Sequence, residues 1–253
     1  MNSYEIAAAA FLCIFCGAVS GFLLQGFLPH HHLSSDSKDS VKLGAGLIAT
    51  MAALILGLLV SSSKGSYDSV NNLINQAAAN CIHLDKVLQD YGPEAIPLRQ
   101  DLRLHTQMIR DSIWPEEIQK KGSAQAFEHD ARITGLTDMI LSLHPSDERT
   151  KQLQNEAVQI ATDLSRQHWL VIVTATSKLP VPLVIIPIFW ITFLTFAYGI
   201  FAPRNATVLA SLFFCSLSIG GAIFLICEMS RPLDGSIKVP SQAFQTALGL
   251  IGR

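Results

Sequence analysis

Three consecutive histidines, His30–His32, stand in a short polar loop close to Asp36 and Asp39. Imidazole nitrogens and carboxylate oxygens are ligands for transition metals. Consecutive residues of one turn rarely all face one ion, however, and no second motif completes a ligand set. We therefore predict no metal site here. Two other roles stay open: Ser35 or Asp36 caps the helix that follows, or the imidazoles sense pH.

Glu228 is the second place where ionisable chemistry is expected. It follows the apolar run 206–227, and Arg231 comes three residues later. A carboxylate at a membrane boundary either pairs with a nearby cation or lines a water-filled path. The spacing favours an ion pair with Arg231, and both residues remain candidates for a pore mouth or an ion-binding position.

Enzymatic chemistry finds little support elsewhere in the sequence. It has no nucleophile with a neighbouring base, no glycine-rich phosphate loop and no paired carboxylates within an apolar run. The five cysteines lie mostly inside apolar runs and follow no disulfide or zinc spacing. We predict a protein that is not an enzyme, with no catalytic residue, no metal and no cofactor.

Four apolar runs must position these residues, at about 6–28, 43–63, 181–202 and 206–227. The chain is 49% hydrophobic and 15% charged, with a mean hydropathy of +0.35, whereas soluble domains carry roughly 25% charged residues. About 20 apolar residues cross the hydrocarbon core as a helix, and backbone groups in lipid must be paired within that helix. Each run is therefore predicted to span a membrane, with the lipid bilayer as its surroundings.

The middle of the chain has the opposite character. Residues 64–165 hold 10 Lys and Arg and 15 Asp and Glu, against 8 and 5 in the rest of the sequence. Such a segment is expected to be a water-soluble insert, and its net negative charge argues against nucleic acid as a partner.

A repeat of about 3.5 residues enters this insert, which is typical of a helix packed along one seam. Its positions are Val70, Ile74, Ala77, Cys81, Leu84, Leu88 and Tyr91, and Gly92-Pro93 ends it. Traced backwards, the seam passes Ser63, Val60, Leu56 and Ala53. The second span is therefore predicted to continue without a break as one helix to Tyr91.

Three further amphipathic helices complete the predicted insert. They cover about 98–113 with His105 on the apolar stripe, about 122–143, and a segment from 146 to about 169. We predict an all-α fold with four transmembrane helices in two hairpins and a helical soluble bundle between spans 2 and 3. The domains are 1–63, the first hairpin; 64–180, the insert; 181–229, the second hairpin; and 230–253, a C-terminal tail.

The charges near the membrane predict the orientation. The side that holds the insert and both termini offers five basic residues, and the other side offers three: Lys38, Lys42 and Arg204. By the positive-inside rule the insert and termini are expected to be cytoplasmic, in an inner (plasma) membrane. The spacing Gly17–Gly21 is a GxxxG pattern, for which packing within one chain and dimerisation are both open.

Several short motifs, in order along nearly the whole chain, resemble the DUF4239 family of bacterial and plant membrane proteins, also described as bestrophin-like. They are Leu28–His31, Asp36–Asp39, Val41–Gly44, Leu47–Met51, Leu56–Leu58, Tyr91–Glu94, Ile113–Pro115, Phe201–Thr207 and Glu228–Gly235. Bestrophins are anion channels built as rings of subunits around a pore lined by the second span. The resemblance thus implies a homo-oligomeric ion channel that conducts inorganic ions.

On that analogy one face of the second span lines the pore, with Gly44, Ile48, Met51, Ile55, Leu58 and Ser62. Rings of Ile and Met form a hydrophobic neck that gates by dewetting. The pore mouths are assigned to His30, His31, His32, Lys38 and Lys42 at one end and to Glu228 and Arg231 at the other. Two alternatives remain, a non-conducting scaffold or sensor whose insert binds a partner, and a metal-dependent membrane enzyme that uses the histidine loop.

Overall fold

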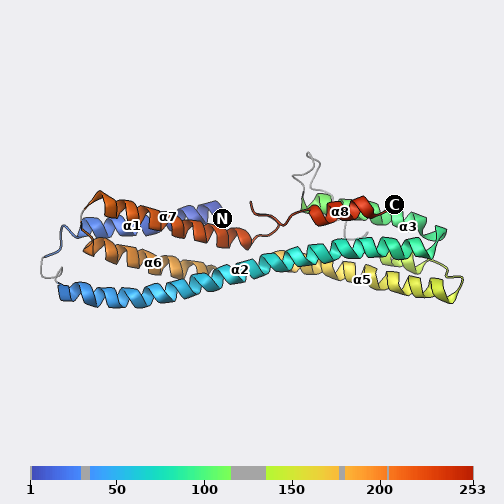
Figure 1. The fold of residues 1–253 in the computed structure, drawn as a ribbon, viewed down its shortest axis with the longest axis horizontal. Helices are drawn as coiled ribbons and strands as arrows, with labels where there is room; N and C mark the ends of the chain where they lie inside the picture. Colours follow the sequence, from blue (N-terminus) through green and yellow to red (C-terminus); the bar gives the residue numbers. More distant parts are fainter. Residues whose placement is uncertain (1, 30–34, 115–134, 177–179, 204, 253) are drawn as a thin grey trace. The chain divides into compact units, whose positions relative to one another are not determined.

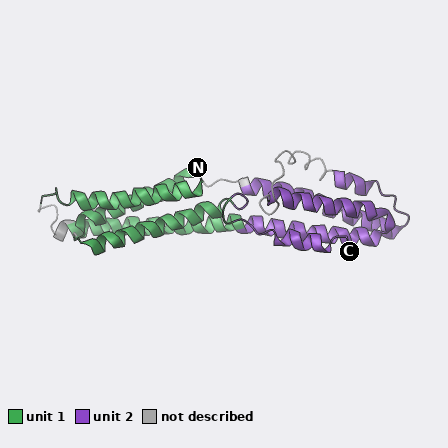
Figure 2. Ribbon diagram, turned by 90° about the horizontal axis from the view of Figure 1, so that it is seen from above, with its two compact units in different colours: residues 1–67, 177–231, 235–237 green, residues 68–176, 232–234, 238–253 purple. Residues whose placement is uncertain are grey.

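The computed structural model describes residues 2–29, 35–114, 135–176, 180–203 and 205–252, and these ranges contain helices and no strand (Figure 1). They divide into two compact units, each described by itself (Figure 2). Unit 1 comprises residues 1–67, 177–231 and 235–237. Unit 2 comprises residues 68–176, 232–234 and 238–253.

Four helices are long and apolar enough to cross a membrane: α1 (Ser3–Leu24), α2 (Ser35–Tyr91), α6 (Val181–Phe201) and α7 (Ala206–Met229). The prediction of an all-α protein with four membrane helices is therefore confirmed. So is the unbroken second helix, because α2 continues to Tyr91 and contributes residues to both units.

In unit 1, α1 packs closely against α6 through glycines. A Cβ placed on Gly17 would lie 2.8 Å from Thr192 Cγ2, and one on Gly21 would overlap the backbone of Phe196. Gly199 on α6 meets the backbone of Ala18 in the same way. The GxxxG pattern thus serves contact within the chain, where small residues let two backbones approach.

The first part of α2 packs with a face that only partly matches the predicted seam. Its buried residues there are Ala45, Ala52, Leu59 and Ser63, whereas Ala53 and Val60 are exposed. The backward extension of the seam therefore holds at Ser63 and at the half-buried Leu56. It is wrong by one position at Val60 and Ala53, where Leu59 and Ala52 are buried instead. An α-helix has 3.6 residues per turn, so a straight helix drifts by about 20° per heptad away from a strict 3.5-residue repeat.

Unit 2 has a core built as predicted around the seam of α2. Leu84, Leu88 and Tyr91 pack with α3 (Ile96–Ile113), with residues 135–141, which are helical, and with α5 (Glu148–Thr176). A short 3₁₀ helix, η2 (Pro93–Ala95), follows its N-cap residue Gly92 and turns the chain between α2 and α3. The predicted helix over 122–143 lies partly outside the described residues.

The C-terminal segment forms a helix that the sequence reading missed, α8 (Gln242–Leu250). Its Phe244 and Ala247 are buried, as is Ile251 just beyond it. Asp85 on α2 accepts two hydrogen bonds from Arg99, at 2.8 and 3.0 Å, and one from the Gly252 N–H at 3.2 Å. Hydrogen bonding to the Asp85 carboxylate raises the pKa of Arg99. Together, Asp85, Arg99 and Gly252 anchor the segment after α8 to α2 and α3.

Candidate functional site

The predicted pore stripe lies on a part of α2 that the protomer leaves largely open. Gly44, Met51, Leu58 and Ser62 are exposed, whereas Ile48 and Ile55 are half-buried. Apart from the adjoining backbone of α2, no atom of the described residues lies within 4 Å of a Cβ placed on Gly44. The stripe therefore borders the packed face of α2, and the described helices of its own chain cover it only in part.

The same is true of the rest of the outer surface of α2 in unit 1. Leu43, Leu47 and Leu54 are strongly exposed. A Cβ on Gly46 or Gly57 would have no atom within 4 Å from other helices in the part of the chain that the structure describes. An apolar surface of this extent belongs in lipid or against another protein. The sequence stripe thus covers only one side of a wider uncovered surface.

One apolar cluster fixes α2 to the rest of unit 1. Ala52 packs with Ile14 of α1 and Ile191 of α6, and Leu56, Trp190 and Ile219 surround them. This contact lies at mid-stripe, so it holds the helix on which Met51 and Ile55 stand.

Glu228 at the end of α7 bonds to the backbone and not to the side chain that the sequence predicted as its partner. Its side chain is 2% exposed. Its Oε2 accepts hydrogen bonds from the backbone N–H of Ser236 and, at 3.3 Å, of Ile237. Among the described residues no ion pair joins it to Arg231, so the predicted pair is wrong. The turn that follows α7 brings the backbone N–H groups of Ser236 and Ile237 to the Glu228 carboxylate, and these groups take the place predicted for the Arg231 guanidinium.

Gly235 makes this turn possible. A Cβ at this position would lie 2.7 Å from Glu228 Oε2 and 3.1 Å from the carbonyl oxygen of Arg231. The Gly235 N–H also donates to that Arg231 carbonyl at 3.0 Å. Residues 228–237 therefore form a closed turn around one buried carboxylate, which we call the Glu228 turn.

Two side-chain contacts join residues of the Glu228 turn that belong to unit 1, Ser230 and Ser236, to other helices of that unit. Ser230 Oγ donates to Ser63 Oγ of α2 at 3.1 Å, and Ser236 Oγ lies 2.8 Å from the Tyr4 hydroxyl of α1. Ser63 is buried and directly follows Ser62, the last residue of the predicted stripe. The sequence placed Ser63 on the seam but predicted no contact for it. Tyr4 and Ser236 were not singled out, because a lone tyrosine or serine carries no distinctive pattern.

The other predicted mouth is only partly described. His30–His32 lie outside the described residues. Lys38 and Lys42 are in the first turns of α2, and Lys42 Nζ lies 3.6 Å from Asp39 Oδ1 in an exposed pair. α2 begins at Ser35, so Ser35 and Asp36 lie in its first turn, and their side chains are not described. In the described part of the chain, no group of three or more His, Cys, Asp or Glu side chains is arranged to hold a metal.

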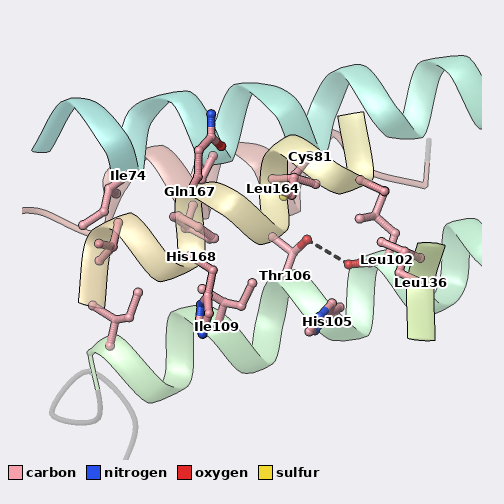
Figure 3. A pocket seen from close by; sticks show the side chains of 15 residues that line it. Ile74, Cys81, Leu102, His105, Thr106, Ile109, Leu136, Leu164, Gln167 and His168 are labelled. Atoms are coloured by element: carbon pink, nitrogen blue, oxygen red, sulfur yellow. Dashed lines mark hydrogen bonds between the residues drawn. The ribbon is translucent and has the colours of Figure 1, made fainter. Parts of the chain in front are cut away.

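Unit 2 holds a small cavity between α2, α3, α5 and α8 (Figure 3). Its volume is about 50 Å³, and one water requires roughly 10–15 Å³. Its lining is mostly apolar, and Thr106 Oγ1 donates to the Leu102 carbonyl at 2.8 Å. Burial raises the pKa of the Cys81 thiol to about 11, against a lowering hydrogen bond with Thr106, so this thiol stays protonated and unreactive. His105, which the sequence placed on the apolar stripe of its helix, is buried.

Comparisons with known proteins agree with this architecture. A family model described as a bestrophin-like domain matches residues 12–244. Two solved structures of variants of a bacterial bestrophin homologue from Klebsiella pneumoniae are similar. One has 14% identity and a TM-score of 0.68 and covers 97% of this chain and 99% of that chain. The other has 14% identity and a TM-score of 0.63 and covers 95% and 99%.

A third structure, of a membrane protein, has 13% identity and a TM-score of 0.60 and covers 99% of both chains. A search of curated protein sequences gave no match. At these identities the solved structures show the fold, and the family model adds the sequence relationship over most of the chain. The four-span chain belongs to the bestrophin-like family.

Proposed function

We propose that the protein is the subunit of a homo-oligomeric ion channel in which α2 lines the conduction path. The observation that carries this proposal is the uncovered apolar face of α2, with Met51 and Leu58 exposed in the protomer. Bestrophin-like membership supports it, since bestrophins are anion channels built as rings. Copies arranged around α2 would cover the face and leave a path along the axis.

The side chains of the stripe indicate how such a path would be controlled. Rings of Met51 and Ile55 contributed by several copies make a hydrophobic constriction, which blocks ions when it loses its water. The Glu228 turn contacts α2 at Ser63, directly after the stripe. We infer that this turn positions α2 at the end of the path near Ser62. In this role Glu228 holds the turn through its hydrogen bonds with backbone N–H groups and does not act as an ion ligand.

Flux measurements on protein reconstituted in liposomes test this proposal. Chloride and potassium are measured separately, because the charges at the two ends of the path have opposite signs. Residues 64–165 carry five more acidic than basic groups. At the opposite mouth, the positive charges among the described residues are those of Lys38 and Lys42. We expect Met51→Ala and Ile55→Ala to raise flux at least about tenfold by widening the constriction.

Leu54→Ala is the matched control, since Leu54 lies on α2 between these residues but on another face and is strongly exposed. It should leave flux unchanged. Vesicles that remain silent for wild type and both stripe variants contradict the channel proposal and favour a scaffold or sensor. Subunit counting of the purified protein is the companion measurement, and a monomer contradicts the ring.

We further propose that the insert and both termini face the cytoplasm of the inner (plasma) membrane, on the excess of basic residues on that side. A reporter protein that is fluorescent only in the cytoplasm, fused after residue 253, tests this orientation. Fluorescence supports it, and a dark but fully expressed fusion contradicts it.

A further inference from the structure

The start of α2, the start of α7 and the end of α6 lie at one end of unit 1 (Figure 1). An apolar groove is lined by residues near these three helix ends. Its volume is about 310 Å³, at the lower end of the range for small-molecule pockets. One wall comes from Ala45 of α2, a second from Ala197 of α6 and a third from Leu212 of α7. Ala45 and Ala197 are buried, so the groove reaches between the helices.

The rim of the groove carries its polar groups. Lys42 and Tyr198 are exposed at this rim, and Ser211 lines it from α7. Lys42 directly precedes the apolar stretch of α2 that begins at Leu43, so its ammonium belongs at the level of the lipid headgroups. The charged groups described at these three helix ends are Lys38, Asp39 and Lys42, which leaves one net positive charge.

An apolar slot that opens at membrane depth below a basic rim matches a phospholipid. We propose that the groove binds one acyl chain of an anionic phospholipid, with its phosphate at Lys42. The acyl chain covers Ala45 and Ala197, and the ammonium group donates hydrogen bonds to phosphate oxygens. The exposed Lys42–Asp39 pair at 3.6 Å is weak enough to be exchanged for this contact.

A helix of a second copy is the competing occupant. Small residues on facing helices let backbones approach, but here they line the floor of a slot between three helices. An apolar helix would also leave the ammonium group of Lys42 without an anionic partner. Lipid retention is measured without ion flux. The inference therefore requires the membrane-spanning unit alone and can fail or hold independently of conduction.

The test uses the full-length protein, stripped of lipid in detergent. It is incubated with an equimolar mixture of phosphatidylglycerol and phosphatidylcholine that carry identical acyl chains. Native mass spectrometry then counts the lipids retained. We expect about fivefold preference for phosphatidylglycerol, the effect of one basic residue near the headgroup. Lys42→Gln should reduce the preference to about one, while Lys151→Gln in unit 2, which is exposed, should leave it unchanged.

Filling the groove tests the acyl-chain half of the proposal. Ala197→Phe and, from the opposite wall, Ala45→Phe should each reduce retention of both lipids severalfold. Ala53→Phe makes the same change at an exposed position of α2 outside the groove and should not. Circular dichroism checks that each variant folds, and Lys42→Gln carries the test where a filled variant does not.

Three results overturn the proposal. Wild type that retains both lipids equally, with no effect of Lys42→Gln, shows no headgroup recognition. Ala53→Phe that lowers retention as much as Ala197→Phe indicates annular lipid only. Wild type without retained lipid, together with a changed subunit number in Ala197→Phe, assigns the groove to a second copy.

Discussion

The two ends of α2 belong to different environments although they form one helix. In unit 2 its apolar side chains are buried by the chain itself, as for Leu84 at 0% exposure, whereas in unit 1 Leu54 is 70% exposed. Both are leucines at ordinary helix positions. The difference teaches that the protein completes the core of unit 2 alone but leaves one face of unit 1 to be covered by lipid or by other copies.

Leu84→Ala probes this contrast with the largest expected effect. Removing a fully buried leucine leaves a cavity and should cost about 2–5 kcal/mol of unfolding free energy. The unfolding midpoint of the purified protein in detergent measures it. Leu54→Ala, the partner in unit 1, should hardly move this midpoint. Equal losses in the two variants would mean that Leu54 is also buried in the assembled protein.

Charged pairs on the two ends of α2 should differ in the same way. Asp85→Asn weakens a buried pair with Arg99, whose two contacts are 2.8 and 3.0 Å. We expect a loss of about 1.5–3 kcal/mol in unfolding free energy, typical of hydrogen bonds to charged groups.

Asp39→Asn is the control for Asp85→Asn, because it removes the exposed pair with Lys42. Exposed pairs contribute little, so its denaturation midpoint should match wild type. A stable Asp85→Asn protein would show that the anchor of the C-terminal segment depends on the apolar contacts of α8 instead.

Glycines on α1 and α2 allow a finer comparison. Gly21→Ala places a methyl group on the Phe196 backbone, and overpacking of this kind costs about 1–3 kcal/mol. Thermal unfolding followed by helix ellipticity measures the loss. An unchanged midpoint would contradict the close approach of α1 and α6.

Gly57→Ala gives the smallest expected effect and the most direct test of what covers α2. Among the described residues no other helix places an atom within 4 Å of a Cβ at this position, so alanine should stabilise the helix by roughly 0.5–1 kcal/mol. Unfolding at several protein concentrations measures the gain. A destabilised variant with fewer subunits would instead place the backbone of another copy against Gly57.

The sequence predicts the helices well and their contacts poorly. Runs of about 20 apolar residues and the seam from Val70 to Tyr91 identify the spans and the long second helix, because hydropathy and periodicity are local properties. α8 was missed although Ser241 precedes it and Phe244, Ala247 and Ile251 are spaced by three and four residues. A nine-residue helix with one apolar stripe is easily read as a tail.

The candidate site was harder to predict for a physical reason. Glu228 and Arg231 are neighbours in sequence, but the carboxylate bonds instead to the backbone of Ser236 and Ile237. Backbone donors carry no residue type, so no motif marks them. The contact between Tyr4 and Ser236 joins residues at opposite ends of the chain, and it exists only once α1 and α7 are folded together.

The closed turn after α7 also determines how mutations in it combine. Glu228 needs the space that a Cβ at Gly235 would take, and Gly235 adopts its place because the carboxylate holds the next two N–H groups. The effects of substitutions at Glu228 and Gly235 should therefore be non-additive. A side chain at 235 should destabilise the turn strongly while the Glu228 carboxylate is present and only slightly once that carboxylate is removed. The double variant should therefore be about as stable as either single variant. Sequence drift at one position should accordingly be accompanied by change at the other.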